Sequence, residues 1–127
     1  MEPSGRFLYL ARTGEDGYRL FRMPAAGGEV ARVLLPPGFN LAPSPLWSSA
    51  VDREGRILLR VNVPDLFFYQ VALFDPAHNT MTLVPVPPRV IVGSAGWSPD
   101  GNIYAAINHW SCSLWHYRIS MQNNGIR

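Results

Sequence analysis

The sequence has no lysine, one cysteine and no long apolar run, and each absence excludes a class of protein. All 11 fixed positive charges are arginines, and they are scattered rather than gathered into the basic surface that nucleic-acid-binding proteins present. Cys112 stands alone, so no intrachain disulfide can form. No stretch approaches the roughly 20 apolar residues that a membrane-spanning helix needs. We therefore expect no nucleic-acid partner and no membrane span.

The composition predicts a folded domain, and no segment assigns it to a compartment. Of 127 residues, 47% are hydrophobic and 16% are charged, which is typical of a chain that buries a core. The opening residues reach a charge at Arg12 too early for the apolar region of a secretory signal. We expect a soluble domain, cytoplasmic or periplasmic, that belongs to a larger protein.

Similar segments recur along the chain and divide it into approximate repeats, at 1–40, 41–89 and 90–127. Each repeat carries a glycine followed by an arginine or asparagine and then a strand-like apolar run; these are Gly5, Gly55 and Gly101. A leucine–aromatic pair follows in each repeat, at Leu20–Phe21, Leu73–Phe74 and Leu114–Trp115. An internal period of about 50 residues indicates one structural unit used repeatedly.

The content of each repeat predicts four short antiparallel strands. The 11 glycines and 12 prolines interrupt the chain too often for long helices. Four strands in about 40 to 50 residues correspond to one blade of a β-propeller. The run after each glycine is apolar on both faces, as in Phe7–Ala11, which predicts a middle strand buried between blades. Asp100 and Gly101, like Gly5 and Gly55, are interpreted as structural turn residues.

Two longer segments carry a family resemblance. "WSPDGNIYAAI" and "LFRMPAAGGEVARVLLPP" resemble the WD40-like repeats of TolB-type and peptidase-associated bacterial propellers. The likeness covers almost the whole chain and implies an all-β fold of four-stranded antiparallel blades. About three blades are fewer than the roughly 4 to 8 that close a propeller. Either the chain is a piece of a longer polypeptide, which we favour, or several copies assemble to complete the ring.

No complete catalytic or metal-binding set of residues is present. Ser98 in "GWSPDG" superficially resembles the nucleophile of α/β-hydrolases, but Asp100 stands where that motif needs a small residue, and an extended run follows where a helix should begin. His109, Cys112 and His116 supply zinc-ligand chemistry but are one ligand short of a closed site. We expect no catalysis, no metal and no cofactor.

The aromatic residues give the best functional signal. Trp47, Trp97 and Trp115 stand at positions that the repeat explains by packing between blades. The remaining candidates fall in predicted loops, where aromatic side chains can form a binding surface; they are Trp110, its neighbour His109, Phe67 and Phe68.

Three functions remain open at this point. The first is a non-catalytic propeller segment that serves as a scaffold for protein interaction or ligand sensing. The second is the gating propeller of a prolyl-oligopeptidase-like serine peptidase whose catalytic domain lies beyond this chain. The third is a small oligomeric lectin that binds sugar. A protein partner or self-association is the interaction we expect most, with sugar as the alternative ligand.

Overall fold

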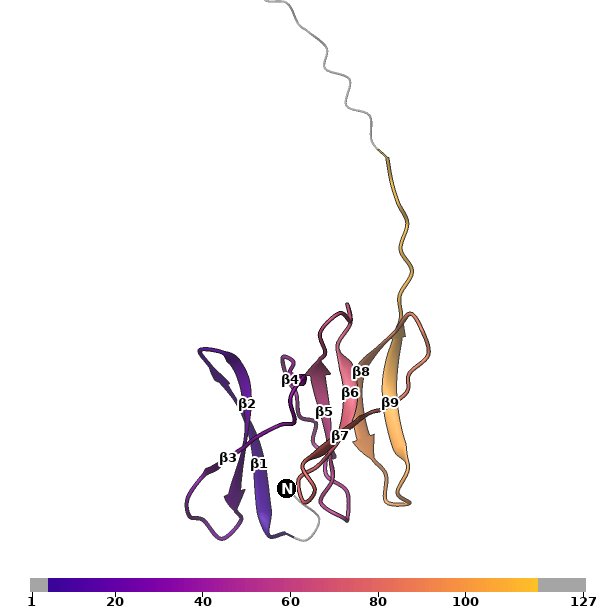
Figure 1. Ribbon diagram of the computed structural model, residues 1–127. Helices are drawn as coiled ribbons and strands as arrows, with labels where there is room; N and C mark the ends of the chain where they lie inside the picture. The colour runs from indigo at the N-terminus through magenta and orange to yellow at the C-terminus, as the bar shows by residue number, and fades with distance from the viewer. Residues whose placement is uncertain (1–4, 117–127) are drawn as a thin grey trace, which may run out of the picture.

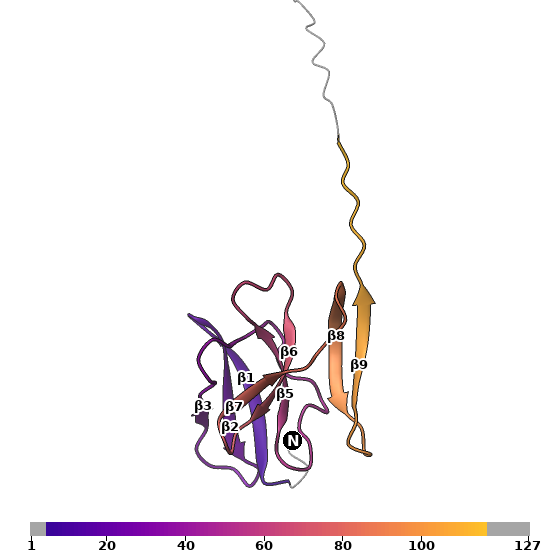
Figure 2. The same ribbon diagram turned by 45° about the vertical axis from the view of Figure 1, so that its right-hand side comes forward.

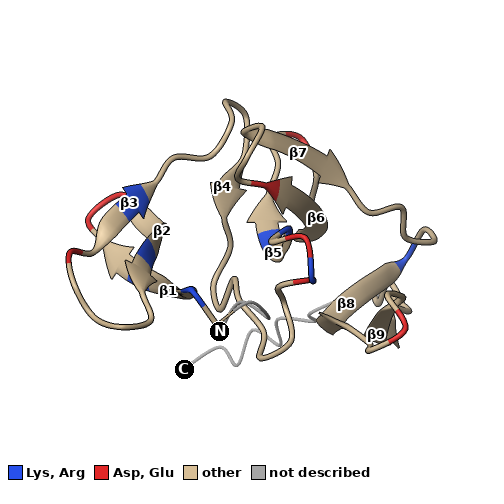
Figure 3. Ribbon diagram, turned by 90° about the horizontal axis from the view of Figure 1, so that it is seen from below, with Lys and Arg blue, Asp and Glu red and all other residues tan. Residues whose placement is uncertain are grey.

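The computed structural model describes residues 5–116, and every regular element in that range is a β-strand in an antiparallel sheet. The all-β prediction is therefore confirmed. Figure 1 shows three groups of strands side by side, and Figure 3 shows the same groups from below. The strands are β1 (Phe7–Gly14), β2 (Gly17–Pro24), β3 (Ala31–Val33), β4 (Asn40–Leu41), β5 (Ile57–Asn62), β6 (Gln70–Asp75), β7 (Thr80–Leu83), β8 (Val90–Trp97) and β9 (Ile103–His109).

The first group is a long hairpin, β1–β2, with the short strand β3 on its far side. The hairpin closes where Gly14 pairs with Gly17, and Gly17 has a φ of 101°, which side chains rarely adopt. Strand β1 is an edge strand whose residues are half-buried or exposed. It is therefore not the buried middle strand that its apolar pattern predicts, because no neighbouring strand covers its outer side within the described residues.

The second group contains most of the hydrophobic core. Strand β4 joins the sheet of the first group to β5, and β6 and β7 continue it, giving the order β1-β2-β4-β5-β6-β7. Ile57, Leu58 and Leu59 of β5 each have 0% exposure. Side chains alternate between the faces of a strand, so burial of three consecutive residues shows that β5 is covered on both faces.

The third group is the two-stranded sheet β8–β9, which contacts the second group through β8. The Arg60 side chain donates hydrogen bonds to the carbonyl oxygens of Val92, at 3.3 Å, and of Gly93. Both acceptors lie at a β-bulge that shifts the β8–β9 register between Val92 and Ser94. Strand β9 lies on the far side of β8 from the rest of the molecule (Figure 2).

A second contact between these groups requires a glycine. The Trp97 N–H donates a 2.9 Å hydrogen bond to the carbonyl oxygen of Ser49. Next to it, a Cβ added to Gly96 would come within 2.0 Å of the Ser49 hydroxyl oxygen. An alanine at this position would require the Ser49 side chain to move, so Gly96 contributes to the close packing of β8 on the second group.

Strand register corrects one detail of the tryptophan alignment. Val51 pairs with Ile57, the first residue of β5, across the turn that contains Gly55. In the same way, Trp97 pairs with Ile103, the first residue of β9, across the turn that contains Gly101. Val51 is therefore the structural counterpart of Trp97. Trp47 stands further from its turn, so it does not occupy the equivalent place that the sequence comparison gave it.

The leucine–aromatic pairs also stand at different registers in the first two groups. Phe21 pairs with Leu10, well into β1, whereas Phe74 pairs with Ile57 at the start of β5. In the first pair the leucine, Leu20, is the buried member, and in the second it is Phe74. The first two leucine–aromatic pairs are therefore similar in composition but do not occupy equivalent positions in their strands. The third pair, Leu114–Trp115, lies in no strand.

No group forms a regular four-stranded sheet of its own within the described residues, and no sheet is closed. The second group comes nearest, with β5, β6, β7 and the bridge at Val51. The third repeat has no strand over 111–116, and its remainder, 117–127, lies outside the described residues, as does the start of the first repeat at 1–4. No described residue belongs to a helix that could cross a membrane.

Candidate binding site

The loop between β5 and β6 and the residue after β9 bring three aromatic side chains together. The Phe67 and Phe68 rings meet edge to face with centroids 5.0 Å apart. The Phe68 ring meets the Trp110 indole in the same way at 5.5 Å. The two loops belong to different groups of strands, so the fold and not the chain order creates this aromatic cluster, defined as Phe67, Phe68 and Trp110.

The backbone of the β5–β6 loop explains why the aromatic cluster is exposed. A turn closes where the Leu66 N–H donates to the carbonyl oxygen of Val63 at 3.2 Å, and Asp65 within it has a φ of 67°. Aspartate tolerates this left-handed conformation better than most residues. The Gln70 side chain then donates to the Phe68 carbonyl oxygen at 2.8 Å and holds the end of the loop. Phe67 is left 87% exposed.

A hollow lies beside the aromatic cluster, with a volume of about 360 Å³. The backbone N–H of Trp110 donates to the Arg89 carbonyl oxygen at 3.0 Å, which fixes the backbone of Trp110 at the end of the β8–β9 ladder. Trp110 is 50% exposed. The hollow is lined by Phe68, Arg89, Trp110, Ser111 and Cys112. An aromatic wall with one cation beside it suits an apolar or aromatic group that carries a negative charge.

Three of the four candidate binding residues are thus brought together, and the fourth stands apart. His109 ends β9 opposite Val90 and is not among the residues that line the hollow. His116 and Cys112 are exposed and lie outside the strands. Among the described residues, no three His, Cys, Asp or Glu side chains converge on a point that could hold a metal ion.

The proposed structural glycines all have left-handed backbone conformations. Gly5, Gly55 and Gly101 have φ values of 70°, 82° and 84°. Gly101 donates its N–H to the Ser98 carbonyl oxygen at 3.0 Å, and Gly55 does the same to Asp52 at 3.2 Å. The turns before β5 and β9 therefore have the same hydrogen-bond pattern. In this pattern Asp52 occupies the position that corresponds to Ser98.

The side chain at the first position of each turn accepts hydrogen bonds from the backbone beyond it. Asp52 accepts from the N–H groups of Glu54 at 2.9 Å and Arg56 at 2.8 Å, and from the Arg56 guanidinium at 2.7 Å. This pairing raises the pKa of Arg56. In the second turn the Ser98 hydroxyl accepts from the Asn102 N–H at 3.2 Å.

Ser98 has the surroundings of a turn cap rather than those of an activated nucleophile. Its hydroxyl donates to the Asp100 carboxylate. Hydrogen bonds from Ser98 and then from Asn102 lower the pKa of Asp100, which makes this carboxylate a weaker base than usual. A nucleophilic serine needs a nearby base that can take its proton near neutral pH.

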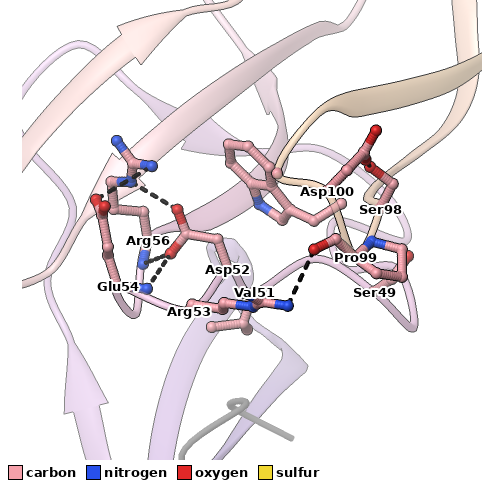
Figure 4. Close-up of a pocket in the computed structure, with 11 residues that line it drawn as sticks. Ser49, Val51, Asp52, Arg53, Glu54, Arg56, Ser98, Pro99 and Asp100 are labelled. Carbon is pink, nitrogen blue, oxygen red and sulfur yellow. Dashed lines mark hydrogen bonds and ion pairs between the residues drawn. The ribbon is translucent and has the colours of Figure 1, made fainter.

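A second hollow, of about 500 Å³, lies between the two turns (Figure 4). Arg53 spans it and donates to the Pro99 carbonyl oxygen at 3.0 Å. The Arg56 guanidinium lies over the Trp97 ring, 5.6 Å from its centroid. The carboxylates of Asp52 and Asp100 already have partners within their own turns. Arg53 therefore joins the two turns, whereas both carboxylates are engaged within their own turns. The buried Trp97 Nε1 is the exception, because it has no hydrogen-bond partner among the described residues. We regard this hollow as structural.

Comparison with known proteins finds no matching family model, no matching curated protein and no matching solved structure. The candidate site therefore depends on the geometry of this chain alone. Sequence reasoning missed Arg89 as a member of the site. The sequence signal that could have identified Arg89 is the Pro-Pro-Arg segment, which indicates a turn before β8. The structure shows this turn, since Arg89 has a left-handed φ of 63°.

Proposed function

We propose that this chain is a non-catalytic segment of a β-propeller whose loops carry a binding surface for a protein partner. Three antiparallel groups lie side by side, and a glycine with a left-handed φ precedes one strand of each group, namely β1, β5 and β9. This arrangement supports blades of a propeller, with the sheet β5–β6–β7 as the most complete one. Loops on a rigid ring can present side chains at little cost in ordering entropy.

The observation that carries the proposal is the contact between Phe68 and Trp110, whose rings come from loops of neighbouring groups. Aromatic side chains held rigid at a surface are the residues that most often dominate binding energy between proteins. Phe67 is exposed at the tip of its loop, and Arg89 supplies a positive charge at the rim. We propose a partner segment with an apolar or aromatic side chain next to an acidic one.

A selection experiment tests this function and reveals the chemistry of the partner at the same time. A library of random peptides displayed on phage is selected on the immobilised chain, and the recovered peptides are measured by calorimetry. We expect aromatic and acidic residues to be enriched. Phe67→Ala and Trp110→Ala should each weaken binding about tenfold, which is about 1.4 kcal/mol. Trp115→Ala is the matched control, because Trp115 is 74% exposed but makes no ring contact with the aromatic cluster.

The other outcomes separate the alternative functions. Peptides that bind Phe67→Ala and Trp110→Ala as well as the unchanged chain contradict the proposal. Binding to a panel of simple sugars that is lost in Trp110→Ala, with no peptide selected, favours an oligomeric lectin. Hydrolysis of peptide or ester substrates that is lost in Ser98→Ala contradicts the non-catalytic assignment. A gating role in a peptidase would need a catalytic domain joined to this chain.

A further inference from the structure

Strand β9 presents an edge that no other described strand covers. All of its residues are exposed, including Tyr104 at 63% and Ile107 at 48%. The strand contains no charged residue and no proline over Ile103–Asn108, although these are the residues that protect edge strands from pairing.

The hydrogen bonds of β9 show which of its backbone groups point outward. Asn102 accepts at its carbonyl oxygen from Ser98, and Trp110 donates its N–H to Arg89, so both residues face the β8 side. Backbone groups alternate along an antiparallel strand. The N–H and C=O groups of Ile103, Ala105 and Ile107 therefore point away from β8 and are available to another strand.

We propose that β9 pairs antiparallel with β9 of a second copy of this chain, about a two-fold axis through Ala105. In this register Ile103 lies opposite Ile107 of the other copy and Ala105 lies opposite itself. Each outward N–H then meets an outward carbonyl oxygen. A two-fold interface must be self-complementary, and this one is. The proposal is independent of the function proposed for the aromatic cluster.

The residue pattern of β9 favours a second copy over an unrelated strand. The segment Asn102–Asn108 reads nearly the same in both directions about Ala105, with asparagine opposite asparagine, isoleucine opposite isoleucine and Tyr104 opposite alanine. Such a pattern puts matched apolar side chains on the same face in both copies. A strand with another sequence would place equivalent side chains opposite those of β9 only by chance.

The paired strands would also extend the core-facing side of the sheet. Ile103, Ala105 and Ile107 share a face with Trp97, Ala95 and Val92, their partners on β8. Val92 and Ala95 belong to the hydrophobic core, at 6% exposure each. Pairing through a single strand buries a modest area, so we expect a dissociation constant on the order of 10 to 100 μM.

The test compares two substitutions that add the same charge on adjacent exposed residues. Sedimentation equilibrium over a range of concentrations should show a monomer–dimer equilibrium for the unchanged chain. Ala105→Lys places two ammonium groups opposite each other at the two-fold axis and should weaken dimerisation at least tenfold, because like charges directly opposite in a sheet repel. Ala106→Lys lies opposite Tyr104 in the proposed register and should leave the dissociation constant within about threefold.

A charge exchange makes the register itself testable. Ala105→Glu alone should weaken the dimer as Ala105→Lys does, whereas an equal mixture of the two variants should restore a heterodimer. Circular dichroism of each variant checks that the sheet is retained. A monomer at all concentrations overturns the proposal, and so does a dimer that resists Ala105→Lys. Protection of the β9 amides from hydrogen exchange in a monomer would assign the edge to another segment of the same chain and overturn it equally.

Discussion

Strands β5 and β9 follow the same kind of turn and differ completely in burial. Each begins two residues after a glycine with a left-handed φ, 82° at Gly55 and 84° at Gly101. Each starts with an isoleucine that pairs with the residue before the turn. Yet Ile57 is 0% exposed, whereas Ile103 is 36% exposed. An apolar run therefore predicts a strand, but the neighbours that the fold supplies decide whether that strand becomes core.

The largest expected difference is in the unfolding free energy lost when each of the two equivalent isoleucines is replaced by alanine. Ile57→Ala should lower the free energy of unfolding by about 3 kcal/mol, because it leaves a cavity in a fully buried site. Ile103→Ala should cost about 1 kcal/mol or less, since the side chain remains partly exposed to water in the folded state. Urea unfolding followed by tryptophan fluorescence, at concentrations where the chain is monomeric, measures both. Equal losses would mean that β9 is covered in solution.

The same contrast separates what the sequence could predict from what it could not. The all-β class follows from local signals, namely the frequent glycines and prolines and the short apolar runs between them. The sequence identifies Phe67, Phe68 and Trp110 as candidates because these aromatic residues fall in predicted loops. Their contact could not be predicted, because it joins loops of two groups of strands, and whether they bind a partner stays a prediction.

Errors of position arose where the repeats differ by small insertions. Trp47 and Trp97 both precede a turn, but extra residues separate Trp47 from the turn at Asp52, so Val51 takes the equivalent place. A displacement along a strand also changes which side chain faces the core. Leu20 and Phe74 illustrate this, since each is the buried member of its leucine–aromatic pair. The amino-acid composition is enough to detect such repeats, but the residues that correspond to one another are found only from the strand pairing in the structure.

A smaller difference is expected between the first residues of the two turns. Asp52→Ala removes the acceptor of two backbone N–H groups and the ion pair with Arg56, at a site where Asp52 itself is buried. We expect a loss of about 2 kcal/mol. Ser98→Ala removes one backbone acceptor at a more open turn and should cost about 1 kcal/mol. Thermal unfolding of both variants provides the comparison, and a greater loss for Ser98→Ala would reverse our ranking of the turns.

The glycines of the two turns should behave alike even though the strands after them do not. Gly55 and Gly101 have nearly the same φ, and a Cβ on Gly101 would meet no atom within 4 Å. The cost of alanine at Gly101 is therefore that of a left-handed backbone, about 1 kcal/mol. Gly55→Ala should cost the same within about 0.5 kcal/mol. A clear difference in the chemical denaturation midpoints would show that the surroundings, rather than the turn, govern these positions.

The smallest effect concerns the carboxylate of the exposed turn. Hydrogen bonds from Ser98 and Asn102 hold the pKa of Asp100 below its ordinary value of 3.8. The stabilisation from these bonds is therefore fully present above pH 3.8 and is lost as the pH falls through the lower pKa of the folded state. Carbon-13 NMR titration of the aspartate carboxyls should show this lowered pKa, and Ser98→Ala should raise it. Asp75 is the internal control, because His78 lowers its pKa in a different turn and Ser98→Ala should not move it. If Asp100 titrates at its ordinary value in the unchanged chain, its hydrogen bonds do not persist in solution.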